Sequence, residues 1–131
     1  MSTRGDSVLI IGAGLAGTTL AQGLRQIGHC GPITLVDQDS SAPYDRPPLS
    51  KQFLLDGDKK SLALMPEDLP NATLIAGKTV TSLDLNMHTA MLQDGGVLPW
   101  DRLVFATGTR PRQLEALAIT PQVRSLRSLE D

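Results

Sequence analysis

The segment Val8-Leu9-Ile10-Ile11-Gly12-Ala13-Gly14-Leu15-Ala16-Gly17 decides the fold of this chain. Its first four residues are an apolar, largely β-branched run of the length of a buried strand. Glycines follow at once. Apolar residues then recur at helical spacing from Leu15 to Ile27, and Gly28 ends the predicted helix. The segment therefore predicts a strand, a glycine turn and a helix in direct succession.

A second apolar run, Ile33-Thr34-Leu35-Val36, predicts another buried strand, and Asp37 follows it. Asp37 lies 20 residues beyond Gly17, which is the spacing of a dinucleotide-binding βαβ unit. The pattern alone leaves open whether FAD or NAD(P) is the dinucleotide. A glycine motif in isolation is a weak signal, but the surrounding strand, helix, strand and acid make it specific.

The residue types fit the chemistry of such a site. Gly12 permits a tight turn out of the strand, and Gly14 lets a pyrophosphate approach the backbone. Gly17 lets the helix pack closely against the sheet. The free N–H groups and the positive dipole at the start of the helix attract phosphates. Asp37 can accept hydrogen bonds from a ribose.

Length and composition narrow the class of protein. The chain has 131 residues, which predicts one domain, and its net charge of -2 provides no basic field for nucleic acid. No window approaches the ~18 apolar residues of a membrane span, and Met1–Ser7 has no signal-peptide core. We therefore expect a cytoplasmic protein that binds neither nucleic acid nor membrane.

Cysteine and histidine usage indicates no metal site. Cys30 is the single cysteine, so an intramolecular disulfide, a dithiol or a cysteine-based zinc site is excluded. We interpret Cys30 as a packing or loop residue. His29 and His88 have no ligand partner at suitable spacing, and both are predicted to lie at the surface.

The rest of the chain predicts short strands with turns between them. A small antiparallel meander follows the βαβ unit, and a core strand then ends at Thr107-Gly108, where small residues let the backbone approach a ligand. Pro48 is predicted to open a short helix. The ranges are a helix over Leu49–Leu54, a loop or single helical turn over Met65–Asp68, and strands over Thr73–Ala76, Thr79–Leu83, Thr89–Leu92, Val97–Leu98, Leu103–Ala106 and Val123–Leu126.

The segment Pro43-Tyr44-Asp45-Arg46-Pro47-Pro48-Leu49-Ser50-Lys51 has two interpretations. It is either a proline-rich surface loop with solvated charges, or a rigid arm that brings Arg46 to a phosphate and Lys51 to an electron-rich ring. The sequence contains no GxSxG, HExxH or P-loop motif. Any chemistry is therefore expected to come from a cofactor that the protein positions.

Four segments together resemble one family. They are residues 12–17, the 43–51 segment, Leu103-Val104-Phe105-Ala106-Thr107-Gly108-Thr109-Arg110-Pro111-Arg112 and Leu126-Arg127-Ser128-Leu129-Glu130-Asp131. They resemble the FAD-dependent ferredoxin–NAD(+) reductases that supply electrons to aromatic-ring dioxygenases, in the pyridine nucleotide-disulfide oxidoreductase superfamily. Related reductases serve bacterial cytochrome P450 systems. The resemblance implies an α/β, Rossmann-like three-layer FAD-binding fold with a small antiparallel β-meander.

The resemblance also implies an activity and a site. Members of the family pass electrons from NADH through FAD to a [2Fe–2S] ferredoxin, a route used in aromatic hydrocarbon catabolism. Lys51 would lie beside the flavin ring as a catalytic residue, where its charge stabilises the electron-rich ring. The implied FAD-binding residues are Gly12, Gly14, Ala16, Gly17, Arg46, Pro47, Lys51, Val80, Thr107, Gly108 and Arg127. No metal site in this chain is implied.

The sequence departs from the family pattern in three places. Gln38 stands where the family commonly has the ribose-binding Asp, so either Asp37 replaces it or the Gln38 amide makes the contact. The stretch from Leu62 to Leu74 is a few residues short and lacks an expected aromatic pair. The third departure is that the family's NADH-binding and C-terminal domains are not within these 131 residues.

Residues 1–131 are therefore expected to form the N-terminal segment of an FAD-binding domain, with little or no turnover on their own. Two other interpretations remain open. One is a non-catalytic, truncated dinucleotide-binding module. The other is the NAD-binding domain of a dehydrogenase, in which Asp37 would repel the 2′-phosphate of NADP. Nothing resembling a disulfide reductase's cysteine pair follows the first unit, since Pro48–Phe53 has no thiol.

Overall fold

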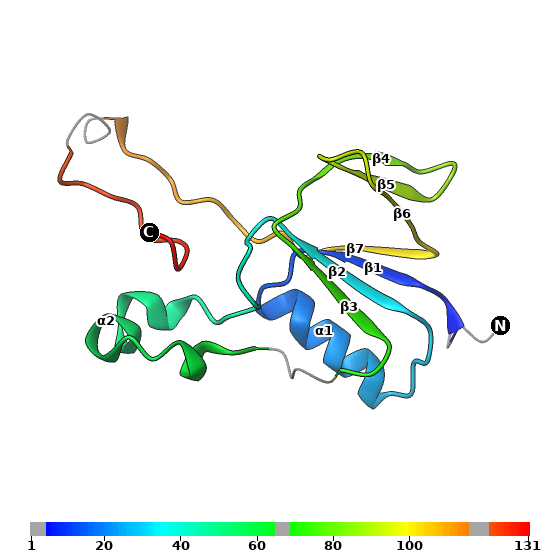
Figure 1. The fold of residues 1–131 in the computed structure, drawn as a ribbon, viewed down its shortest axis with the longest axis horizontal. Helices are drawn as coiled ribbons and strands as arrows, with labels where there is room; N and C mark the ends of the chain where they lie inside the picture. Colours follow the sequence, from blue (N-terminus) through cyan, green and yellow to red (C-terminus); the bar gives the residue numbers. More distant parts are fainter. Residues whose placement is uncertain (1–4, 65–68, 116–120) are drawn as a thin grey trace.

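The computed structural model describes residues 5–64, 69–115 and 121–131, and a four-stranded parallel sheet lies at the centre of these ranges (Figure 1). The strand order is β3-β2-β1-β7. The strands are β1 (Val8–Ile11), β2 (Ile33–Asp37), β3 (Ala72–Ala76) and β7 (Arg102–Phe105). The apolar runs pair in register, with Val8 opposite Ile33 on one side and opposite Arg102 on the other.

The two faces of this sheet are covered by different elements. Helix α1 (Leu15–Gln26) covers one face, where Ala21 packs against Ile10 and Leu35. An antiparallel sheet covers the other face, where Leu9 packs against Ala90. Its strands are β4 (Val80–Asp84), β5 (Thr89–Leu92) and β6 (Val97–Pro99). Figure 1 shows the central sheet between α1 and the antiparallel sheet, which confirms the predicted three layers and the meander.

The proline-rich segment forms an arm that extends from the sheet (Figure 1). The predicted helix over Leu49–Leu54 is wrong, because two shorter pieces take its place. They are the 3-10 turn η2 (Pro47–Ser50) and the helix α2 (Gln52–Asp56), and the 3-10 turn η3 (Lys59–Leu62) follows. Pro47 and Pro48 stand at the first positions of η2, where an N–H group would have no partner within the helix, so they are compatible with a helix start. Lys51, at φ -131° and ψ -108°, interrupts the helix.

Other boundaries also differ from the sequence prediction. The strand expected over Val123–Leu126 is not formed, since no strand of the described residues lies beside it to share hydrogen bonds. β3 and β7 exist as predicted but form the two edges of the described sheet, so their side chains are only partly buried. Phe105 is 65% exposed for this reason. The prediction for Met65–Asp68 falls outside the described residues.

The prediction that His29 lies at the surface is wrong, because the residue is only 9% exposed. Gly28, at φ 84°, turns the chain under the end of α1. The backbone N–H of His29 then donates to the carbonyl of Leu24 at 2.9 Å, and the ring is covered. His88 is exposed as expected, in the turn between β4 and β5. Cys30 lies in the exposed loop between α1 and β2, as its interpretation as a loop residue predicts.

The glycines at both ends of the first turn hold three elements together. Gly12 has φ 107°, and a Cβ built there would overlap the carbonyl of Ala106 at the end of β7. A Cβ on Gly17 would overlap the carbonyl oxygen of Gly12. β1, α1 and the end of β7 can therefore approach this closely only because these residues lack side chains.

Two glycine substitutions in α1 test this packing. Gly17→Ala is expected to lower the free energy of unfolding by about 1–3 kcal/mol or more, because the methyl group overlaps backbone. Gly23→Ala is the matched control: its Cβ meets no atom within 4 Å, and alanine is the better helix former. We expect Gly23→Ala to raise stability by about 0.5–1 kcal/mol. Urea unfolding measures both, and equal effects would contradict the packing account.

Candidate functional site

A cavity of about 1340 Å³ lies at the carboxyl edge of the parallel sheet. This edge is where open α/β sheets bind their ligands. The volume exceeds the roughly 300–1,000 Å³ typical of a small-ligand pocket, so an extended ligand can be accommodated. The lining residues come from six stretches of the chain, and they lie within residues 11–16, 36–40, 44–47, 78–80, 105–113 and 125–131.

The start of α1 faces this cavity with unsatisfied backbone donors. Gly14 is the N-cap residue, no side chain caps the helix, and the first turn carries no acid. The first N–H groups of an α-helix have no partner within the helix. A Cβ built on Gly14 would meet nothing within 4 Å, so the cavity is open beside the N-cap residue. The arrangement is suited to an anionic group such as a phosphate.

Asp37 joins the second strand to the glycine turn. One carboxylate oxygen accepts a hydrogen bond from the backbone N–H of Ala13 at 2.6 Å, and the other accepts from the N–H of Asp39 at 2.9 Å. Both carboxylate oxygens thus accept a hydrogen bond from a backbone N–H group, and the bond to Ala13 helps to position the glycine turn. Asp37 and Gln38 both line the cavity, so the ribose contact remains open to either residue.

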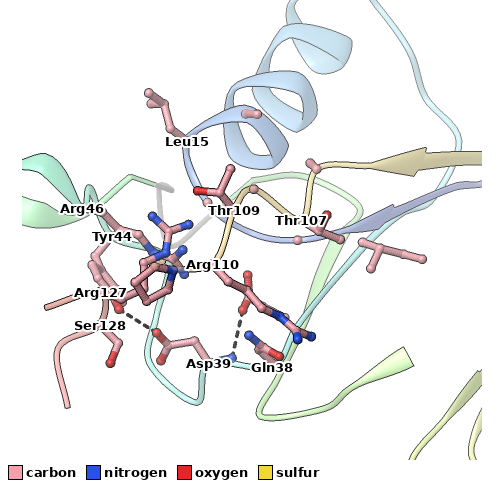
Figure 2. Close-up of a pocket in the computed structure, with 18 of the residues that line it drawn as sticks. Leu15, Gln38, Asp39, Tyr44, Arg46, Thr107, Thr109, Arg110, Arg127 and Ser128 are labelled. Atoms are coloured by element: carbon pink, nitrogen blue, oxygen red, sulfur yellow. Dashed lines mark hydrogen bonds between the residues drawn. The ribbon is translucent and has the colours of Figure 1, made fainter. Parts of the chain in front are cut away.

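Tyr44 and Asp39 form a hydrogen-bonded pair at the wall of the cavity (Figure 2). The Tyr44 hydroxyl donates to the Asp39 carboxylate at 2.7 Å. Burial raises the pKa of Asp39, but hydrogen bonds from Tyr44 and Ser41 and the charge of Arg46 outweigh burial, and the pKa lies below its ordinary value. Burial and the neighbouring carboxylate raise the pKa of Tyr44. At neutral pH the carboxylate is therefore charged and the phenol is neutral.

Three arginines bring positive charge to the cavity. Arg46, Arg110 and Arg127 all line it, and Figure 2 shows Arg46 and Arg127 beside Tyr44. The Arg46 guanidinium lies 5.9 Å from the centre of the Tyr44 ring, a cation–π distance. The Arg127 guanidinium lies against Gly108, where a Cβ would be 3.2 Å from its nitrogen. The cavity thus combines helix N–H donors with cationic side chains, which favours a phosphorylated ligand.

Most of the predicted site residues come together here. Those that line the cavity are Gly12, Gly14, Ala16, Asp37, Gln38, Arg46, Pro47, Val80, Thr107, Gly108 and Arg127. Gly17 is buried beneath the turn and packs against it. Lys51 is exposed at the junction of η2 and α2 and does not line the cavity, so its role beside a flavin stays a prediction.

Sequence reasoning missed several lining residues. Tyr44, Asp39, Arg110 and Lys78 all face the cavity. Tyr44 is the only tyrosine of the chain and lies inside the most specific segment, and this could have drawn attention to it. Asp39 becomes meaningful only once the fold places it beside Tyr44. Lys78 forms an ion pair with Asp94 at 2.5 Å, which tethers the start of β4 to the turn after β5.

The described residues contain no group of three or more histidine, cysteine or acidic side chains arranged to hold a metal ion. Within the same ranges, no helix has the length and apolar character needed to cross a membrane.

The fold and the cavity define a dinucleotide-binding α/β protein. The family described as pyridine nucleotide-disulphide oxidoreductase matches residues 6–131, and the chain belongs to this family. The chain is 43% identical over 130 residues to the ferredoxin–NAD(+) reductase component of the p-cumate 2,3-dioxygenase system of Pseudomonas putida. It is 41% identical over 134 residues to the putidaredoxin reductase of Pseudomonas putida.

The shared region is limited to one part of these relatives. Each match covers 96% of this chain and 32% of the relative, so the chain spans about a third of their length. The crystal structure of a covalent putidaredoxin reductase–putidaredoxin complex superposes with a TM-score of 0.85 at 38% identity. That superposition covers 96% of this chain and 32% of the solved chain.

Asp37→Asn tests whether this carboxylate braces the glycine turn. An amide can present its oxygen to only one of the two backbone N–H groups, so its own NH₂ faces the other donor. We expect the free energy of unfolding to fall by about 1–3 kcal/mol. Asp84→Asn is the matched control, because Asn86 and Met87 both donate to the same oxygen, Oδ1. It is expected to change stability by less than about 0.5 kcal/mol. A loss no larger for Asp37→Asn than for Asp84→Asn, measured by urea unfolding, would contradict the bracing role.

Proposed function

We propose that residues 1–131 form the N-terminal part of the FAD-binding domain of an NADH-dependent ferredoxin reductase. One observation carries this proposal. The glycine turn, the arm of residues 43–51, the segment after β7 and the segment 126–131 are far apart in sequence, yet all contribute to one cavity. These are the four segments on which the family resemblance rests.

The residues present fit FAD. The open space before Gly14 and the uncapped start of α1 suit the pyrophosphate. Arg46 and Arg127 would neutralise its charge. Val80, at the start of β4, would meet the adenine through its backbone, while Thr107 and Gly108 would let the cofactor pass close to the end of β7. Bound FAD would supply the chemistry that accepts two electrons as one hydride and releases them singly.

The proposed reaction passes two electrons from NADH, by way of FAD, to two molecules of a [2Fe–2S] ferredoxin, one electron to each in two single-electron steps, with release of NAD⁺ and a proton. The ferredoxin would serve an aromatic-ring dioxygenase, as the name of the relative from the p-cumate system indicates for that protein. The segment after the first unit has no cysteine pair, so the electrons would leave directly for an external carrier. We assign the reaction to the cytoplasm. Lys51 would stabilise negative charge near the flavin ring.

The NAD-binding domain of a dehydrogenase is the competing function, and Asp37 is the observation that favours it. A dehydrogenase domain would use this acid to bind the ribose of NAD. Here each oxygen accepts one backbone N–H and can accept a further hydrogen bond, so Asp37 alone does not distinguish the ribose of NAD from that of FAD. The dehydrogenase interpretation leaves the 43–51 arm and Arg127 without a role, which favours FAD. A non-catalytic nucleotide-binding module would share the cavity and differ only in lacking electron transfer.

Gly14→Ser tests the flavin site without disturbing the fold. The purified chain is expected to retain flavin absorbance after addition of FAD and desalting. Serine is a good N-cap, so the stability of the Gly14→Ser variant should be unchanged or slightly higher. Its side chain would occupy the phosphate position and take the N–H groups, and FAD affinity should fall about tenfold or more.

Gly5→Ser is the control for this test, since a Cβ at Gly5 also meets no atom within 4 Å and Gly5 does not line the cavity. It should bind FAD like the unchanged chain. Equal FAD binding by Gly14→Ser and Gly5→Ser, with both proteins folded by circular dichroism, would refute the placement of the pyrophosphate.

Turnover separates this piece from a complete reductase. The sequence holds one GxGxxG motif, which the proposal assigns to FAD, and the family uses a second one for NADH. The 131-residue polypeptide loaded with FAD is therefore expected to show little or no NADH-driven reduction of a ferredoxin or a dye. Sustained NADH oxidation by this polypeptide alone would overturn the assignment of its single motif to FAD.

A further inference from the structure

One hydroxyl group connects the loop after β2 to the last residues of the chain. The Tyr44 hydroxyl donates to the Asp39 carboxylate at 2.7 Å and accepts a hydrogen bond from the backbone N–H of Leu129 at 3.1 Å. These partners lie 5 residues before and 85 residues after Tyr44. The hydroxyl is thus the joint between two segments that meet only in the fold.

The Tyr44 side chain is buried, and its hydroxyl both donates and accepts a hydrogen bond. Tyr44 is 7% exposed and forms a small apolar cluster with Leu49 and Leu62, against which Leu129 packs. The hydroxyl donates to Asp39 and accepts from Leu129, and the aromatic ring without its hydroxyl could make neither hydrogen bond. Phenylalanine would keep the packing of the ring and leave both the Asp39 oxygen and the Leu129 N–H without this partner.

The tethered segment carries a cation into the cavity. Asp131 Oδ2 accepts hydrogen bonds from the backbone N–H groups of Arg127 and Ser128, each at 2.7 Å, which closes a tight turn next to Leu129. The Arg127 guanidinium leaves this turn and lies against Gly108 on the β7 side of the cavity. Figure 2 shows Tyr44, Arg127 and Ser128 gathered at one wall. No strand pairing of the described residues 121–131 holds this turn in place.

We propose that Tyr44 is a positioning residue that acts through Arg127. Its hydroxyl fixes the 127–131 turn against the sheet and so holds the Arg127 guanidinium where it meets the phosphates of the dinucleotide. This inference rests on the proposed function for the identity of the ligand. It assigns Tyr44 a role in ligand affinity in addition to its place in the apolar cluster.

Tyr44→Phe tests the tether, with FAD as the probe and flavin fluorescence as the readout. Loss of the hydroxyl is expected to weaken FAD binding about tenfold, mainly through a faster dissociation rate. Thr81→Val is the control: it also removes a hydrogen-bonded hydroxyl, here one that donates to the backbone carbonyl of Met91 in the antiparallel sheet, and Thr81 does not line the cavity. Thr81→Val should bind FAD like the unchanged chain.

A double-mutant cycle separates positioning from general stability. If Tyr44 acts through Arg127, Tyr44→Phe should have no further effect on FAD affinity once Arg127→Met has removed the guanidinium. The proposal is overturned if Tyr44→Phe binds FAD normally, or if it costs the same tenfold in the Arg127→Met background.

Amide hydrogen exchange tests the tether without any ligand. The Leu129 amide should exchange faster in Tyr44→Phe than in the unchanged chain, while amides of β1 and β2 stay equally protected. Failure of the unchanged chain to bind FAD would refute the proposed function, and the Leu129 exchange rate would then decide the tether by itself. Equal exchange at Leu129 in the two proteins would overturn the tether.

Discussion

The close approach of the first turn to the end of β7 is the constraint on which the rest of the structure depends. Gly12 takes a left-handed conformation and has the carbonyl of Ala106 where a Cβ would lie. Gly17 in turn packs onto Gly12. This contact sets the start of α1 at the carboxyl edge of the sheet, and the start of the helix then lines the cavity.

Acidic side chains hold the loops that surround this contact. Asp37 accepts a hydrogen bond from the backbone N–H of Ala13 in the glycine turn, and Asp39 accepts one from the Tyr44 hydroxyl. Both carboxylates are thus engaged with the protein itself, and Arg46, Arg110 and Arg127 are lining cations that remain for a ligand, alongside the lining acids Asp45 and Glu130. The uncapped start of α1 and these arginines are the groups of the cavity that suit a pyrophosphate. The family match covers residues 6–131, and all the residues of the proposed flavin site lie within this range.

Local patterns predicted the elements, and long-range contacts decided the rest. The strands around Val8–Ile11 and Ile33–Asp37, the first helix and the meander followed from apolar periodicity and glycine placement. The edge position of Phe105 did not follow, because apolar composition does not report which strand has a neighbour on each side. The burial of His29 depends on the turn at Gly28, and the division of the 49–54 helix depends on Lys51, and neither has a clear local signal.

The site was predicted to a similar extent. The prediction again missed the residues whose place depends on long-range contacts. Glycines and the 43–51 segment led to most lining residues because the motif spacing carries that information. The pairing of Tyr44 with Leu129 spans 85 residues and could be found only in the folded chain. For Lys51 the sequence pattern predicts a place beside a flavin ring, but the residue does not line the cavity.

The most direct test of the central claim is the relative affinity of the purified chain for FAD and NAD⁺, measured by calorimetric titration. The account predicts that FAD binds at least about tenfold more tightly than NAD⁺, because the 43–51 arm and the 126–131 segment extend the cavity beyond what a nicotinamide dinucleotide requires. Equal affinities, or tighter binding of NAD⁺, would contradict the assignment of this cavity to FAD.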